Sequence, residues 1–156
     1  VCDWSSDVCS SDLLDIERLP TRKDVTDTHA ALEYALENGY DEVDIYGVTG
    51  GRLDHFLSVM CLLEKYADKK IRIIDQQNVI QLLLPGTHKV YQDEYKYFSL
   101  YALDDAYIDI DGAEYPLNQY FLQRQDPLCV SNQVSCEIAT ITNSKPIVLV
   151  KSKDAW

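Results

Sequence analysis

The segment Thr49-Gly50-Gly51-Arg52-Leu53-Asp54-His55 stands between a strand pattern over residues 42–48 and a helix pattern over residues 53–66. Two glycines let the backbone approach a ligand closely, and a helix start presents unpaired N–H groups to an anion. A cation such as Arg52 in the first turn opposes the helix dipole by about 0.3–1 kcal/mol, which is easier to explain if a polyanion binds there. The segment predicts a phosphate-bearing ligand, while a plain loop with Arg52 in solvent fits the same residues.

A second group of polar residues opens the preceding helix pattern. Asp24, Thr26 and Asp27 precede a run over residues 30–38 with apolar residues at helical spacing, and Gly39 is placed to end it. The two carboxylates, three residues apart, lie on one face of the helix start. They suit either ordinary helix capping or a Mg²⁺ ion whose other ligands are substrate phosphates and water.

The order of predicted elements changes partway along the chain. Helix, strand, helix and strand follow one another over residues 24–38, 42–48, 53–66 and 71–75, as in a parallel sheet covered by helices. Short strands separated by turns then follow, over residues 79–84, 88–91, 97–102, 106–110, 136–142 and 147–151. The predicted fold class is α/β: a partial parallel α/β nucleotide-binding domain over residues 14–77, followed by a β-sandwich or partial barrel over residues 78–156.

The first residues of the chain are interpreted separately. Residues 1–13 carry a near-repeat of Ser-Ser-Asp that resembles translated sequencing adapter, and we interpret them as a non-native leader, a short native tail being the alternative. They lack the basic region and apolar core of a signal peptide, and the chain has no run of ~18 apolar residues. We therefore expect a soluble, cytoplasmic protein without a membrane span.

The charge and the cysteine content narrow the possible functional classes further. The formal net charge is −12 and no basic stripe is present, which argues against nucleic acid as the main partner. The commonest phosphate-loop motifs are absent. Cys61, Cys129 and Cys136, the cysteines outside the leader, match no zinc spacing, so we expect reduced thiols, with Cys61 buried on its helix.

The ordered combination of Asp-x-Thr-Asp, a helix, a strand and Gly-Gly-Arg-Leu-Asp-His resembles the thiamine pyrophosphokinase family. The resemblance extends from about residue 21 to residue 154, through Asp75, Asn78, the Gly-Ala-Glu-Tyr-Pro-Leu stretch of residues 112–117 and Val130-Ser131-Asn132. Two departures affect the site: Cys129 and Gln133 replace a glycine and an acid that flank the Ser-Asn pair in the family, and the family's front motif, Asp-Phe-Asp-Ser, has no counterpart before Asp24.

The resemblance implies an enzyme, a thiamine diphosphokinase that uses Mg²⁺ and ATP to convert thiamine to thiamine diphosphate, with AMP as the second product. It implies a homodimer with thiamine sites between subunits. It also implies that Asp27 holds Mg²⁺ with Asp24 nearby, and that Gly50, Gly51 and Arg52 face the polyphosphate.

The remaining residue roles come from the same resemblance. Asp54 would position the metal–phosphate assembly or accept the hydroxyl proton, and Thr26 and His55 would contact the nucleotide. Ser131 and Asn132 would bind thiamine. These residues also have structural alternatives. A carboxylate at Asp54 would stabilise the helix dipole, His55 fits an ordinary helix position, and a Ser-Asn pair is common in turns.

The missing front motif leads to two further expectations. The chain resembles an N-terminally truncated family member, so we expect little or no turnover from it, because the metal would lose part of its ligand shell. The alternative function is a non-catalytic module that binds nucleotide or Mg²⁺ and uses its β-rich half to bind a protein.

Overall fold

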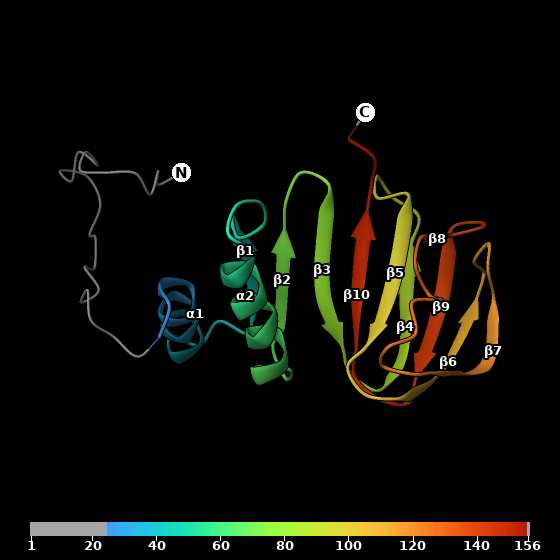
Figure 1. Cartoon of the computed structure of the whole chain (residues 1–156), viewed down its shortest axis with the longest axis horizontal. Helices are drawn as coiled ribbons and strands as arrows, with labels where there is room; N and C mark the ends of the chain where they lie inside the picture. The colour runs from blue at the N-terminus through green and yellow to red at the C-terminus, as the bar shows by residue number, and fades with distance from the viewer. Residues whose placement is uncertain (1–24, 156) are drawn as a thin grey trace.

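The computed structural model describes residues 25–155, which form two helices and ten strands (Figure 1). The helices are α1 (Asp27–Glu37) and α2 (Leu53–Lys65). The strands are β1 (Glu42–Tyr46), β2 (Lys70–Ile74), β3 (Asn78–Leu83), β4 (Gly86–Tyr91), β5 (Tyr97–Ala102), β6 (Ala106–Asp111), β7 (Leu117–Leu122), β8 (Asn132–Gln133), β9 (Ile138–Asn143) and β10 (Ile147–Ser152). Neither of these two helices is long and apolar enough to cross a membrane.

The strands form two sheets that divide the molecule unequally. A six-stranded sheet has the order β1-β2-β3-β10-β5-β8, and a four-stranded sheet has the order β4-β9-β6-β7. Among the strands of residues 25–155, only β1 and β2 pair in parallel, and the other pairs are antiparallel. Because β2 pairs with β3, one sheet runs without interruption across the domain boundary predicted at residues 77 and 78. The helices lie beside the parallel end of this sheet, and the second sheet lies behind its other end (Figure 1).

Helix boundaries follow from local chemistry. The side chain of Thr26 caps α1 by accepting a hydrogen bond from the backbone N–H of His29 at 3.2 Å, and Gly39, with φ of +87°, follows its end. At the start of α2 the N-cap is Arg52, whose side chain makes no capping hydrogen bond. The first-turn N–H groups of α2 therefore have no partner from the N-cap side chain, and one of them, that of His55, bonds to the Asp54 carboxylate instead.

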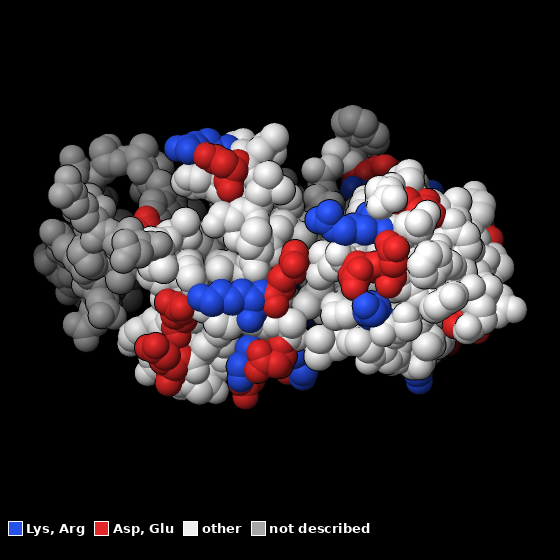
Figure 2. Space-filling model, turned by 60° about the horizontal axis from the view of Figure 1, so that its bottom comes forward, with Lys and Arg blue, Asp and Glu red and all other residues white. Residues whose placement is uncertain are grey.

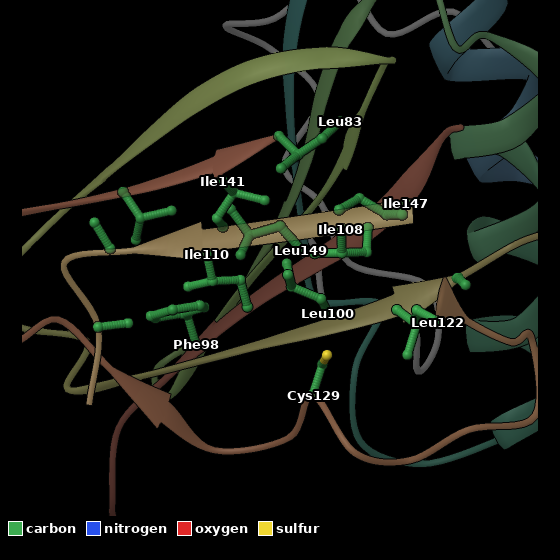
Figure 3. Close-up of a cluster of buried hydrophobic side chains, with 14 of the residues drawn as sticks. Leu83, Phe98, Leu100, Ile108, Ile110, Leu122, Cys129, Ile141, Ile147 and Leu149 are labelled. Carbon is green, nitrogen blue, oxygen red and sulfur yellow. The ribbon is translucent and has the colours of Figure 1, made fainter. Parts of the chain in front are cut away.

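Two hydrophobic cores share the central strands. On β10, Ile147 and Leu149 pack into the sandwich between the sheets, while Val148 between them packs toward the helices. This alternation follows from the two-residue period of a strand. Figure 3 shows the sandwich core, into which the Cys129 thiol also points. The cores are thus joined through strands that contribute to both.

Three sequence expectations need correction. The strands β7 and β8 were not predicted, because Asn118 and Gln119 interrupt the apolar alternation of β7 and β8 is only two residues long. The expectation of a buried Cys61 is wrong, since this thiol is exposed. The buried residues of α2 are Val59, Leu62 and Leu63.

Candidate functional site

The glycine segment forms a turn at the carboxyl end of β1, immediately before α2. Gly50 and Gly51 have φ angles of +76° and +99°. A Cβ atom at either position would meet no heavy atom within 4 Å. Glycine is therefore needed here for the backbone conformation, and the space beside the turn is open.

Three predicted site residues form one cluster at the start of α2. The Nε atom of Arg52 donates to Oδ1 of Asp54 at 3.1 Å, and its Nη2 atom donates to Oδ2. The backbone N–H of His55 donates to the same carboxylate at 3.0 Å. The hydrogen bonds from Arg52 lower the pKa of Asp54 to about 2, and Asp54 in turn raises the pKa of Arg52.

This pairing changes the interpretation of Arg52. The sequence suggested that a cation beside a helix start is easier to explain if a polyanion binds there, but here Asp54 supplies a negative partner from the same turn. Both side chains remain exposed, at 73% for Arg52 and 62% for Asp54. The pair is therefore accessible, and an exposed ion pair of this kind contributes little to stability.

Asp75 follows the neighbouring parallel strand, β2, and contacts the glycine segment through Thr49. Its Oδ1 atom accepts hydrogen bonds from the backbone N–H groups of Gln77 and Asn78, both at 2.7 Å. Burial raises the pKa of Asp75, but hydrogen bonds from the hydroxyl of Thr49 and from these amides outweigh burial, and the pKa lies below its usual value. Asp75 thus connects the ends of β1 and β2, which lie at the same end of the sheet (Figure 1).

Thr49 and Asp75 were not predicted as site residues. Ligands of open α/β sheets bind outside the carboxyl ends of the parallel strands. An acidic residue at the carboxyl end of the second predicted strand was the signal that could have identified Asp75.

The first turn of α1 is placed by contacts at the far end of α2. The ring of His29 lies with Nε2 3.1 Å from the hydroxyl of Tyr66, and that hydroxyl donates to Glu33 at 2.8 Å. Tyr66 follows the 13 residues of α2, about 20 Å of helix away from Arg52. Placement of Asp27 beside the glycine turn stays a prediction, and Asp24 lies outside the described residues.

The carboxylates suit only one type of metal site. Within residues 25–155 no group of three His, Cys, Asp or Glu side chains is arranged to hold a metal ion. Mg²⁺ commonly takes one or two protein carboxylates and completes its shell with substrate phosphates and water. The described residues therefore fit a Mg²⁺ ion that arrives with phosphates, and do not fit a closed cage made by protein alone.

The predicted thiamine residues behave differently from each other. Asn132 is buried; its Oδ1 accepts from the N–H of Tyr115 at 3.0 Å, and its Nδ2 donates to the C=O of Tyr115 at 2.8 Å. Ser131 is exposed, with φ of +60°, and its backbone N–H donates to the hydroxyl of Ser99. The amide of Asn132 is thus occupied in fixing the Tyr115 backbone, while the Tyr115 side chain remains exposed.

Comparisons with known proteins match both halves of the chain. The family model for the thiamin pyrophosphokinase catalytic domain matches residues 3–74, and that for the thiamin pyrophosphokinase vitamin B1 binding domain matches residues 87–148. The first match begins inside the segment that we interpret as a leader. That interpretation stays a prediction.

Individual relatives agree with the family models. The thiamine pyrophosphokinase of Bacillus subtilis is 39% identical over 138 residues, which are 85% of this chain and 64% of that protein. Its crystal structure matches with a TM-score of 0.80 at 37% identity, over 85% of this chain and 65% of that one. The thiamin pyrophosphokinase of Geobacillus thermodenitrificans matches with a TM-score of 0.81 at 36% identity, over 87% and 65%. The chain thus spans slightly less than two thirds of the length of these relatives.

Proposed function

This chain belongs to the thiamine pyrophosphokinase family, and on that premise we propose that it transfers pyrophosphate from ATP to thiamine. The products are thiamine diphosphate and AMP, and the step belongs to thiamine diphosphate biosynthesis in the cytoplasm. The observation that supports this proposal best is the open glycine turn, with its Arg52–Asp54 pair, at the carboxyl ends of two parallel strands.

The glycine turn is the proposed triphosphate site. Gly50 and Gly51 leave space for the phosphates beside the backbone, and the N-cap residue makes no side-chain capping bond to the N–H groups at the start of α2. Arg52 keeps its contact with Asp54 and turns its remaining N–H donors to phosphate oxygens when the nucleotide binds. Because both side chains are exposed, this contact requires little desolvation.

The low pKa of Asp54 separates two roles that the resemblance leaves open. In the reaction, the thiamine hydroxyl attacks the β-phosphorus and the bond between the α- and β-phosphates breaks. A general base works best with a pKa near the working pH, whereas the pKa of Asp54 is about 2. Asp54 is therefore assigned to orienting Arg52 and the phosphates, and His55 to contacting the nucleotide or accepting the proton.

The acidic start of α1 is the proposed metal site. Asp27, with Asp24, would hold Mg²⁺, and the Thr26 segment would contact the nucleotide. Mg²⁺, when bound, neutralises charge on the phosphates. Asp27 is exposed, so its carboxylate is accessible to such a complex.

The β-sandwich is the proposed thiamine site, completed by a second subunit in a homodimer. Ser131 and the exposed ring of Tyr115 form its surface, and Asn132 is a positioning residue that fixes the Tyr115 backbone. A cationic aromatic substrate suits an aromatic ring on a chain with a net charge of −12. On the described part of the face in Figure 2, basic side chains lie among acidic ones and form no continuous band.

A product assay tests the proposal. We expect AMP and thiamine diphosphate to form only with Mg²⁺, and Asp27→Ala to abolish both, while Glu37→Ala, a matched control at the other end of α1, retains them. The assay is run on this chain and on a version that restores the family's front acidic motif, with greater turnover expected from the latter. ATP binding without turnover by the restored version would overturn the proposal in favour of a non-catalytic module.

A further inference from the structure

A hollow of about 260 Å³ lies on the face of the six-stranded sheet opposite the helices. Ile71 and Ile73 of β2 pack into the helix core, so Arg72 between them points to the other face. There it lines the hollow together with residues of β3, β10 and β4. Since β4 is the outermost described strand of the second sheet, the hollow lies along a strand edge. The sheet separates this hollow from α2.

Hydrogen-bond donors converge on this hollow from several strands. Arg72 comes from β2, Lys89 from β4 and Lys151 from β10, and the Gln81 amide joins them from β3. Cations from three strands approach the hollow from different directions. Asp93 is the one carboxylate among the lining residues, so the hollow keeps an excess of positive charge in a chain with a net charge of −12, which favours anions.

The free edge of β4 adds backbone donors. The N–H of Gln92 donates to the C=O of Glu137 next to β9 at 2.9 Å. Because bonding alternates along an antiparallel strand, the N–H groups of Tyr91 and Lys89 point away from β9, toward the free edge. Both residues line the hollow.

The existing ion pairs leave one of the three cations available. Arg72 pairs with Asp44, with Nε 2.7 Å from Oδ1, and Lys151 pairs with Asp93. Lys89 forms no ion pair within residues 25–155. A lysine on an edge strand can also serve to prevent edge pairing, but that role requires no cations on the facing strands.

The ring of Tyr95, which lines the hollow, lies against two lysines, of which Lys151 also lines it. The ammonium groups of Lys151 and Lys153 lie 5.5 Å and 5.1 Å from the centre of its ring. The electron-rich ring face attracts cations, so Tyr95 limits the freedom of both side chains. Lys151 is consequently kept at the hollow rather than extended into solvent, with only 15% of its side chain exposed.

We propose that this hollow binds a small phosphate-bearing anion at a site separate from the glycine turn. Lys89 and two backbone N–H groups supply the direct donors, and the ion-paired Arg72 and Lys151 add positive charge around them, which suits a phosphate oxyanion. The volume is smaller than that of pockets for drug-sized ligands, so the ligand is small.

The test is a titration of the ¹⁵N-labelled chain followed by two-dimensional NMR. Inorganic phosphate is compared with sodium chloride at equal ionic strength. We expect saturable shifts at residues 89–95 and 149–151 with phosphate only. Lys89→Gln should weaken binding roughly tenfold, because it removes a charge-assisted contact. Lys145→Gln, which removes an exposed lysine paired with Asp104, should bind as the unaltered chain does.

Other outcomes would overturn the proposal. These are equal shifts in sodium chloride, unchanged affinity in Lys89→Gln with its spectrum otherwise intact, and shifts confined to residues 49–55. Arg52→Gln separates the two sites, because it should leave phosphate binding at the hollow unchanged. Failure of the hollow proposal therefore leaves the proposed triphosphate site untouched.

Discussion

The glycine turn and the sandwich core differ in how their residues are held. Around the turn, Arg52 and Asp54 are exposed and bond mainly to each other. In the sandwich, Ile108, Leu122 and Ile141 have no exposed surface. Burial of apolar area supplies most folding free energy, whereas an exposed ion pair supplies little. The two regions therefore have separate tasks: the sandwich holds the fold, and the turn is available for a ligand.

The largest expected effect is on the sandwich. Ile141→Ala should lower the free energy of unfolding by roughly 2–5 kcal/mol, because it removes a fully buried side chain and leaves a cavity. Leu57→Ala, on the exposed side of α2, should change it by less than about 0.5 kcal/mol. Urea denaturation followed by circular dichroism measures both. Similar losses in the two variants would contradict the separation of tasks.

Two glycines offer a sharper form of the same comparison. Gly112 has φ of +71°, and a Cβ there would lie 2.5 Å from the carbonyl oxygen of Ile138, so Gly112→Ala should cost roughly 3 kcal/mol. Gly51 has φ of +99° with open space, so Gly51→Ala should cost only about 1 kcal/mol. Thermal and urea unfolding of both variants checks the difference. A larger loss for Gly51→Ala would show that the turn, too, supports the fold.

A substitution of Arg52 tests the claim that the glycine turn is available for a ligand. Arg52→Gln should weaken ATP binding in the presence of Mg²⁺ roughly 30-fold, about 2 kcal/mol, because a charge-assisted contact to phosphate is lost. Its Tm should barely change, since the side chain is exposed. Lys65→Gln, at the other end of α2, is the control for loss of charge. Titration calorimetry that gives equal affinities for the two variants would argue against a triphosphate at this turn.

The smallest expected effect concerns pH. Because the folded-state pKa of Asp54 is lowered from 3.8 to about 2, its ion pair stabilises the fold above pH 4. That contribution is lost as the pH falls toward 2. An NMR titration should find the low pKa in the unaltered chain and a pKa closer to 3.8 in Arg52→Gln. An unchanged pKa in that variant would show that another group holds Asp54 ionised.

Periodicity predicted most of the fold, because it reports which side of an element is buried. The strand over residues 97–102 was predicted with the bounds of β5, and the start of α2 at Leu53 was also correct. The strand β7 escaped prediction because its stability comes from pairing with β6, not from its own pattern. The sharing of β3 and β10 by both cores depends on the pairing order of distant strands, which sequence does not encode locally.

The sequence predicted which residues form the glycine-turn site, but not how they hydrogen-bond to one another. The motif identified Arg52, Asp54 and His55 as neighbours, and the structure brings them into one cluster. The motif did not reveal that Arg52 and Asp54 form an ion pair with each other, because that contact depends on the directions of their side chains. Nor did it reveal that Asn132 bonds to Tyr115, since the two residues are brought together only by the folding of the sandwich.

The central claim is that Asp27 and the Arg52 turn bind one metal–triphosphate complex, and paramagnetic NMR tests it most directly. Mn²⁺ replaces Mg²⁺ in the presence of ATP, with Mn²⁺ alone as the control. The account predicts ATP-dependent broadening of amide signals from both residues 26–28 and residues 50–55, while signals from β7 stay sharp. Broadening of only one of these two segments would contradict it.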